Sequence, residues 1–277
     1  MSAKNDPIGV FDSGVGGLSV LRVIREQMPV ENLIYLGDQG HVPYGARPIE
    51  EIQKFSEEIT RFLLGQNSKL IVVACNTASA AALTYLREKF PDVTFVGMEP
   101  AVKPAAETTK TGKVGVLATP ATFQGALYAS VVERFGAGVE LFQNTCPGLV
   151  QQIERGELDS KETRVILENA LTPMLEKNID TVVLGCTHYP FVIPLIQQIV
   201  GETVRVIDPA PAIARQVGRL LDSKELKNTS DSKGQSQFYT SGDVHTVESV
   251  LPKLLGRSDL VRGVDWDDMG EKIRARS

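Results

Sequence analysis

The sequence predicts an α/β protein of two similar domains, each built on a mostly parallel sheet flanked by helices. Short apolar runs rich in β-branched residues alternate with longer helical segments, which is the pattern of parallel βα units. Two of these runs, 71–74 and 182–185, are continuously apolar, as is typical of strands covered on both faces. A weak internal repeat, described below, divides the chain of 277 residues into two halves.

Each expected element follows from its local pattern. The apolar runs predict strands at 8–12, 33–37, 70–75, 94–96, 114–118, 139–142, 181–186 and 204–207, with a weaker strand at 237–241. The segments between them predict helices at 17–28, 49–66, 78–90, 100–108, 123–135, 161–176, 190–200, 209–221 and 244–255. The stretch 223–237 is rich in Ser, Lys, Asp and Asn, so we expect an exposed loop there.

The internal repeat consists of two strand–turn pairs that recur in the same order. Ile8-Gly-Val-Phe-Asp-Ser-Gly in the first half corresponds to Val114-Gly-Val-Leu-Ala-Thr-Pro in the second. Val72-Val-Ala-Cys-Asn-Thr likewise corresponds to Val183-Leu-Gly-Cys-Thr-His. We therefore expect one α/β domain over residues 1–98 together with the returning segment 208–277, and a second over 99–207.

Composition excludes several classes of function. The net charge is -5, from 34 acidic and 29 basic residues without a Lys/Arg cluster, so a nucleic-acid partner is not expected. No apolar run reaches membrane-spanning length, and the start of the chain lacks the apolar core of a signal peptide. Three cysteines, an odd number, indicate reduced thiols and a cytoplasmic protein. Their spacing and that of the three histidines match no metal motif, and neither a P-loop nor a G-x-S-x-G elbow occurs.

Cys75 and Cys186 occupy equivalent places in the two halves. Each ends an apolar strand and precedes helix-starting residues, which begin at Asn76 and at Thr187. Ligands of open α/β sheets bind at the carboxyl ends of strands, where a helix N-terminus lowers the pKa of a thiol from about 8.5. A lone cysteine is more often a small buried residue, but two at equivalent positions favour reactive thiols facing one cleft. Cys146 has no counterpart in the repeat and is interpreted as a packing residue.

A glycine-rich turn follows the first strand. Gly14, Gly16 and Gly17 come after Asp12 and Ser13, but their spacing does not fit the dinucleotide motif G-x-G-x-x-G. The simpler interpretation is a tight turn whose backbone N–H groups, with Ser13, bind a carboxylate or phosphate. Asp12 can either tune a nearby thiol or form the turn.

The second half offers polar residues at the corresponding places. His188 can bind a ligand or a thiolate, or act as a general acid or base, and the alternative is an ordinary loop histidine. Thr119 and Thr122 can bind an anion or simply cap a helix.

Four motifs together resemble a known family. They are Asp12-Ser-Gly-Val-Gly-Gly-Leu, Pro43-Tyr-Gly, Ala74-Cys-Asn-Thr-Ala-Ser and Leu184-Gly-Cys-Thr-His-Tyr-Pro, and in this order and spacing they resemble the aspartate/glutamate racemases. The resemblance runs from about residue 8 to 208 and beyond. Within the family, the Asp-Ser-Gly start and Pro-Tyr-Gly favour the glutamate racemases.

The resemblance implies a fold, a reaction and a set of site residues. It implies two α/β domains with pseudo-twofold symmetry, an active site in the cleft between them, and cofactor-independent interconversion of L- and D-glutamate for peptidoglycan synthesis. Cys75 and Cys186 match the two acid/base residues, and Asp38 and Glu154 lie where the family has supporting acids. The positions matched to substrate binding are Asp12, Ser13, Tyr44, Gly45, Asn76, Thr77, Thr119, Thr122, Thr187 and His188.

Two alternatives stay open at this point. Another two-cysteine racemase, for example of aspartate, would share the catalytic residues and differ in the size of the cleft. A non-catalytic solute-binding protein of two α/β lobes would also place a ligand between domains, although it has no need of thiols. A homodimer is one option for the assembly, and the sequence leaves the oligomeric state open.

Overall fold

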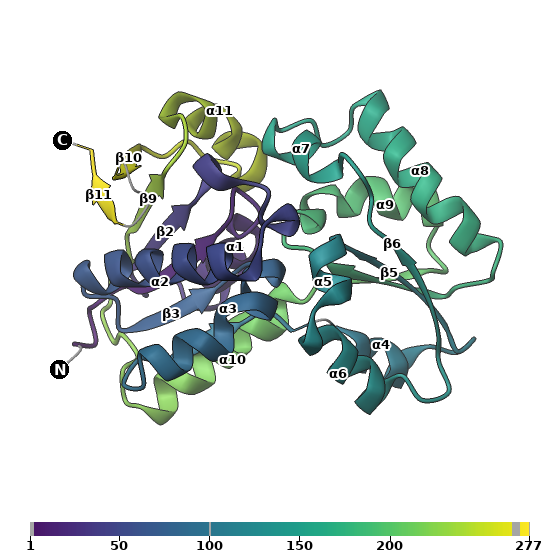
Figure 1. The fold of residues 1–277 in the computed structure, drawn as a ribbon, viewed down its shortest axis with the longest axis horizontal. Helices are drawn as coiled ribbons and strands as arrows, with labels where there is room; N and C mark the ends of the chain where they lie inside the picture. Colours follow the sequence, from purple (N-terminus) through teal and green to yellow (C-terminus); the bar gives the residue numbers. More distant parts are fainter. Residues whose placement is uncertain (1–2, 100, 268–271, 277) are drawn as a thin grey trace.

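The structure, a computed structural model, describes residues 3–99, 101–267 and 272–276. It consists of two α/β domains that lie side by side (Figure 1), each with a sheet covered by helices on both faces. The described ends of the chain both lie on the first domain, away from the second. The predicted fold class of two mostly parallel α/β domains is confirmed.

The first domain contains a seven-stranded sheet in the order β11-β10-β9-β2-β1-β3-β4. All neighbouring strands are parallel except β10 and β11. Its strands are β1 (Ile8–Asp12), β2 (Leu33–Gly37), β3 (Leu70–Val73), β4 (Phe95–Gly97), β9 (Ser236–Thr240), β10 (Val261–Trp266) and β11 (Ile273–Ala275). The end of the chain thus completes the sheet that its start begins.

Two groups of helices cover this sheet. One face packs against α1 (Leu18–Gln27), α10 (Ala210–Ser223) and α11 (Val244–Leu255). The other packs against α2 (Ile49–Gly65) and α3 (Asn76–Lys89). Strand residues therefore alternate between two apolar cores: Val10 and Val72 face the first, whereas Phe11 and Val73 face the second. This double burial explains the continuous apolar runs of the sequence.

The second domain repeats the central part of the first. Its four parallel strands, in the order β6-β5-β7-β8, are β5 (Lys113–Ala118), β6 (Glu140–Asn144), β7 (Thr181–Gly185) and β8 (Arg205–Ile207). One face packs on α4 (Val102–Thr108) and α6 (Ala126–Phe135), the other on α7 (Leu149–Glu154), α8 (Lys161–Leu175) and α9 (Ile193–Val200). The order matches β2-β1-β3-β4 strand for strand, so the weak sequence repeat corresponds to a repeat of topology.

Several expectations need correction. The helix expected at 123–135 is two helices, α5 (Pro120–Gln124) and α6, because Gly125 is extended, with ψ 140°. The loop expected at 223–237 is not exposed throughout, since Asn228 is 6% exposed and its backbone N–H donates to Glu31. The expected helix at 100–108 begins at Val102, and residue 100 lies outside the described residues. The boundaries 98/99 and 207/208 stay predictions.

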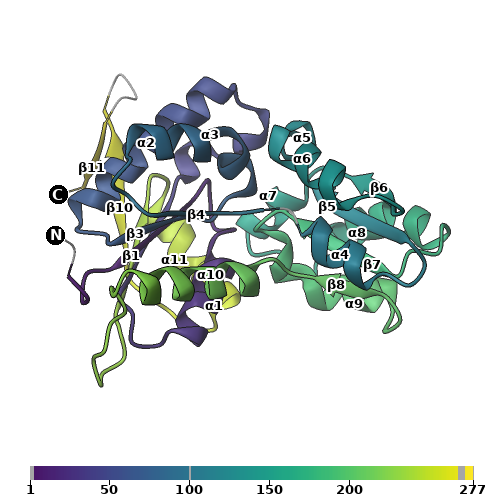
Figure 2. The same ribbon diagram turned by 90° about the horizontal axis from the view of Figure 1, so that it is seen from below.

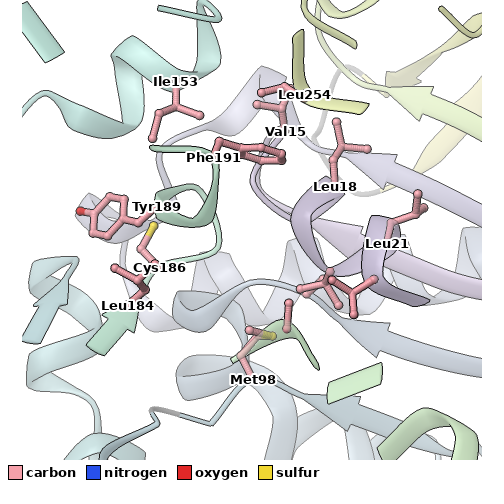
Figure 3. Close-up of a cluster of buried hydrophobic side chains, with 14 of the residues drawn as sticks. Val15, Leu18, Leu21, Met98, Ile153, Leu184, Cys186, Tyr189, Phe191 and Leu254 are labelled. Atoms are coloured by element: carbon pink, nitrogen blue, oxygen red, sulfur yellow. The ribbon is translucent and has the colours of Figure 1, made fainter. Parts of the chain in front are cut away.

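The two domains meet along an apolar seam on one side. Figure 3 shows Phe191 of the second domain among Val15, Leu18 and Leu254 of the first, with Ile153 of α7 close by. Phe191 lies in the segment that follows Cys186, where a short 3₁₀ helix, η3 (Tyr189–Val192), leads into α9. The seam therefore packs the first turn of α1 against the chain beside Cys186.

Candidate active site

The candidate residues lie at the carboxyl ends of strands. In both domains the strand order reverses between two neighbouring strands, β1 and β3 in the first and β5 and β7 in the second. Ligands of open α/β sheets bind outside the carboxyl ends of strands at such a reversal. In the first pair, Asp12 ends β1 and Cys75 lies two residues after β3, and in the second pair Thr119 follows β5 and Cys186 follows β7. The repeat therefore brings two equivalent half-sites to the domain boundary.

Residues from both half-sites line one pocket at the domain boundary. It contains the two predicted catalytic cysteines and eight of the predicted substrate-binding residues, Ser13, Tyr44, Gly45, Asn76, Thr77, Thr119, Thr187 and His188. The other four predicted residues, Asp12, Asp38, Thr122 and Glu154, do not line the pocket but hydrogen-bond to residues that do. Both thiols thus face the same pocket.

Cys75 is the first of the two thiols. Its extended backbone places it as the N-cap of α3, where its Sγ accepts a hydrogen bond from the backbone N–H of Ala78 at 3.4 Å. Its thiol also donates to Ser13 Oγ at 3.8 Å. Burial, and next the negative charge of Asp12, raise the pKa of Cys75 well above its ordinary value, whereas the hydrogen bonds from Ala78 and Ser13 lower it less. The expectation of a lowered pKa at this helix start is therefore wrong for Cys75, because burial outweighs the helix N-terminus.

Cys186 has different neighbours. Its Sγ lies 3.7 Å from Nδ1 of His188, and Nε2 of the same ring lies 2.6 Å from Oε1 of Glu154. Burial lowers the pKa of His188, but hydrogen bonds to Cys186 and Glu154, with their negative charges, outweigh it and hold that pKa well above its usual value. The raised pKa of His188 favours the positively charged form of its ring between the sulfur and the carboxylate. All three of the chain's cysteines are free thiols in the structure.

The glycine-rich turn binds carboxylates of the protein itself. The N–H of Gly14 donates to Asp12 Oδ2 at 3.1 Å, and the N–H of Val15 donates to Glu154 Oε1 at 2.8 Å. A Cβ at Gly14 would lie 1.9 Å from that Glu154 oxygen. The turn was expected to bind the carboxylate or phosphate of a ligand. These two N–H groups instead hold protein carboxylates, and the glycines make room for the second domain.

Tyr44 is held by a buried carboxylate. Its hydroxyl donates to Asp38 Oδ2 at 2.7 Å, and Asp38 is fully buried. Asp38 Oδ1 also accepts hydrogen bonds from Ser241 Oγ at 2.5 Å and Trp266 Nε1 at 3.0 Å. Because its hydroxyl proton is directed to Asp38, Tyr44 offers the pocket its ring and backbone. Asp38 thereby ties the Tyr44 turn to the end of the chain.

Three threonine hydroxyl groups form a row across the domain boundary beside the pocket. Oγ1 of Thr77 lies 3.2 Å from Oγ1 of Thr119, which lies 3.0 Å from Oγ1 of Thr122. Thr119 also caps α5, so the capping and pocket-lining interpretations both hold. The side-chain amide of Asn76 is buried without a hydrogen-bond partner among the described residues. A buried amide is costly to leave unpaired, so Asn76 is suited to bind a polar ligand.

Sequence reasoning missed two lining residues, Pro43 and Val150. Pro43 belongs to a motif that the sequence does display, so its place beside Tyr44 could have been proposed. Val150 lies in α7, a helix of six residues with no clear periodic pattern, and no sequence signal indicates it. Within the described ranges, no group of His, Cys, Asp and Glu is arranged to hold a metal ion. None of the described helices is long and apolar enough to span a membrane.

A two-domain α/β protein with one thiol from each domain at a shared pocket has the architecture of a two-base racemase. Comparison with known families agrees: the model of the Asp/Glu/Hydantoin racemases matches residues 8–217. The chain belongs to this family, and the resemblance seen in the motifs is confirmed, as is the prediction of a racemase.

Individual relatives cover nearly the whole chain. A glutamate racemase of Pseudomonas paraeruginosa is 48% identical over 96% of this chain and 100% of its own. A glutamate racemase isoform of Bacillus anthracis has a similar structure, with a TM-score of 0.84 at 35% identity over 95% of this chain and 98% of its own. The glutamate racemase of Francisella tularensis, solved in complex with D-glutamate, gives 0.82 at 32% identity over 95% and 99%.

Proposed function

We propose that this protein interconverts L- and D-glutamate by cofactor-independent proton transfer at Cα, with Cys75 and Cys186 as the two acid/base residues. The observation that carries the proposal is the pair of thiols, from equivalent strand ends of the two domains, that line a single pocket. Racemisation removes a proton from one face of Cα and returns one to the other. Two groups on opposite sides of the substrate, one thiolate and one thiol, can do both.

The neighbours of Cys75 and Cys186 indicate which of the two thiols starts as the proton donor. His188, held by Glu154, lies beside Cys186, and its raised pKa favours a positive charge next to that sulfur. Burial, and next the charge of Asp12, raise the pKa of Cys75 and favour its thiol form. Cys75 is therefore suited to act as the proton donor, and each turnover exchanges the roles of the two groups.

The pocket can stabilise the negative charge that develops in the reaction. Loss of the Cα proton places charge on the α-carboxylate, and donors aimed at that carboxylate lower the barrier. Asn76 has an unpartnered amide, and Ser13, Thr77 and Thr119 bring hydroxyl groups to the pocket wall, whereas the Thr187 hydroxyl donates to Asp12. We assign these residues to the substrate, with Gly45 and the ring of Tyr44 completing the wall, Asp38 fixing Tyr44, and Thr122 fixing Thr119.

The substrate of the relatives indicates a metabolic role for the product of this protein. All three relatives described above are named glutamate racemases, and the structure of one of them contains D-glutamate. We infer that the product D-glutamate is consumed by peptidoglycan synthesis. Because the reaction uses a reduced thiol and a thiolate, we place the protein in the reducing cytoplasm.

The test is loss of optical activity of D-glutamate, followed by circular dichroism without added pyridoxal phosphate. Cys75→Ala and Cys186→Ala should each abolish the reaction in both directions, since every turnover uses both groups. The enantiomers have equal free energies in water, so kcat/KM must fall equally for both. Cys146→Ala is the matched control, because Cys146 is buried but does not line the pocket. Near-normal activity of either active-site variant would exclude the two-thiol scheme.

The same assay separates the alternatives. Racemisation of aspartate in preference to glutamate would identify a different racemase of this family. Binding of glutamate without exchange of its Cα proton in heavy water would indicate a solute-binding protein, because a protein that only binds has no means of removing that proton.

A further inference from the structure

We propose that Ser19, in the first turn of α1, is a positioning residue that sets the place of Cys186 relative to Cys75. This inference rests on the proposed function, since it concerns the spacing of the two thiols. Ser19 does not line the pocket, and none of the motifs singled out above assigns it a role. Its hydroxyl donates to the backbone carbonyl of Thr187 at 2.8 Å, across the domain boundary. Ser19 is 1% exposed and Thr187 2% exposed, so no bulk water competes for this bond.

The chain around Thr187 explains why a side chain must supply this donor. The turn after β7 is closed by bonds between residues three apart, from the N–H of Tyr189 to the carbonyl of Cys186 and from the N–H of Phe191 to that of His188. The corresponding partner of the Thr187 carbonyl would be the nitrogen of residue 190. That residue is Pro190, which has no N–H. Ser19 therefore supplies the donor that the turn itself lacks.

The bond acts at the peptide next to the reactive sulfur. Thr187 stands between Cys186 and His188, and its own hydroxyl donates to Asp12 Oδ1 at 3.3 Å. Asp12 in turn interacts with Cys75, because its negative charge, after burial, raises the pKa of that thiol. The first domain therefore holds Thr187 at two atoms. Ser19 bonds to its carbonyl oxygen, and Asp12, which lies beside Cys75, accepts a hydrogen bond from its hydroxyl.

The start of α1 packs closely against the turn that follows β7. A Cβ at Gly16 would lie 2.8 Å from Thr187 Oγ1, and Leu18 packs with Phe191 in the apolar seam (Figure 3). The Ser19 bond fixes the backbone of the turn along this surface, beside the bond from the Thr187 hydroxyl to Asp12. Proton transfer depends steeply on the positions of the reacting atoms, so a shift of the turn slows the reaction without removing any group that contacts the substrate.

The experiment compares Ser19→Ala with Ser56→Ala. Ser56 is a matched control: it is fully buried, lies in α2 of the same domain, and its hydroxyl has no partner in the described part of the structure. Ser19→Ala should lower kcat by about 10- to 100-fold with KM nearly unchanged. The primary isotope effect with glutamate deuterated at Cα should rise, because proton transfer limits the rate more fully. Ser56→Ala should leave kcat, KM and the isotope effect as in the wild type.

A double-mutant cycle tests the stated cause. Pro190→Ala restores an N–H three residues after Thr187, so Ser19→Ala/Pro190→Ala should recover much of the kcat lost in Ser19→Ala. Ser19→Thr keeps the hydroxyl and should retain most of the activity. Equal kinetics of Ser19→Ala and Ser56→Ala would overturn the proposal, and so would a loss that Pro190→Ala does not repair. Absence of racemisation in the wild type would instead contradict the proposed function.

Discussion

Asp12 lies beside Cys75, whereas His188 lies beside Cys186, so the two thiols have neighbours of opposite charge. A symmetric reaction does not require symmetric surroundings, because the substrate needs one base and one acid at any moment. Burial and Asp12 keep Cys75 protonated, and the raised pKa of His188 keeps a positive charge next to Cys186. Ionisation of one thiol makes ionisation of the other harder, so the two titrate as a pair.

The pH dependence of kcat/KM should be bell-shaped. At low pH the base is protonated, and at high pH no thiol remains as proton donor. Because burial first and Asp12 second raise the pKa of Cys75, Asp12→Asn should move the alkaline limb to lower pH. The measurement is kcat/KM for both enantiomers from acidic to alkaline pH.

The control for this shift is Asp222→Asn, an identical substitution at a carboxylate whose side chain is 58% exposed. It should leave both limbs in place. An alkaline limb that stays unchanged in Asp12→Asn would show that Asp12 does not influence the proton donor. A profile that reaches a plateau and never falls, with the protein still folded, would show that a single ionisable group matters.

At the scale of elements, the turn between β1 and α1 is shaped by the second domain. A Cβ at Gly16 would lie 2.4 Å from Nδ1 of His188, and that ring is fixed by Glu154 through its other nitrogen. The ring therefore cannot move aside without losing its partner. Gly16→Ala should lower kcat/KM by about 10- to 100-fold, and it should also lower the thermal unfolding temperature because the added methyl group overpacks a buried contact, as checked by circular dichroism melts.

Gly65→Ala is the matched control for this substitution. Gly65 ends α2, and no atom lies within 4 Å of the position that its Cβ would occupy. Alanine there should preserve activity and leave stability equal or slightly higher, since alanine favours helix more than glycine does. Full activity of Gly16→Ala would disprove the close fit between this turn and His188.

The accuracy of the sequence prediction depends on how each element is stabilised. The strands 8–12 and 33–37 and the helix 244–255 are observed with the predicted bounds, because buried strands and amphipathic helices display their pattern locally. The strands β10 and β11 and the short helix α7 were missed. β11 is three residues long and mostly exposed at a sheet edge, so it forms through pairing with β10 and not through its own sequence.

At the scale of the whole molecule, some features of the site depend on how the two domains pack together, and the sequence alone does not predict them. The thiols, Ser13, Thr119 and His188 were predicted because they follow strand ends, whereas the other predicted lining residues were matched through the family motifs. Val150, Ser19 and the bond from Val15 to Glu154 depend on which surfaces meet across the boundary. The raised pKa of Cys75 has the same origin, since burial of the strand end sets it and the capping pattern alone does not.

A buried ion pair ties the start of the chain and the loop before β9 to the first sheet. Nζ of Lys69 lies 2.6 Å from Oε2 of Glu31, and neither side chain is exposed. Lys69 also donates to the carbonyl of Lys4, and the other Glu31 oxygen accepts from the backbone N–H of Asn228. These contacts lie before β2 and β3, at the end of the sheet opposite the thiols. They should therefore govern stability and leave catalysis unaffected.

Lys69→Met should lower the free energy of unfolding of the first domain by about 3–5 kcal/mol, because it leaves the Glu31 carboxylate buried without its partner charge. Urea denaturation followed by circular dichroism measures this loss.

Glu31→Gln/Lys69→Met removes both charges and should recover a large part of the lost stability. Lys103→Met is the control, since its pair with Glu107 is 3.9 Å apart and more than half exposed, and should change stability by about 0–1 kcal/mol. kcat/KM at low temperature should match the wild type in all three variants. A Lys69→Met protein as stable as Lys103→Met, or a double variant less stable than Lys69→Met, would show that the buried pair does not hold the returning segment in place.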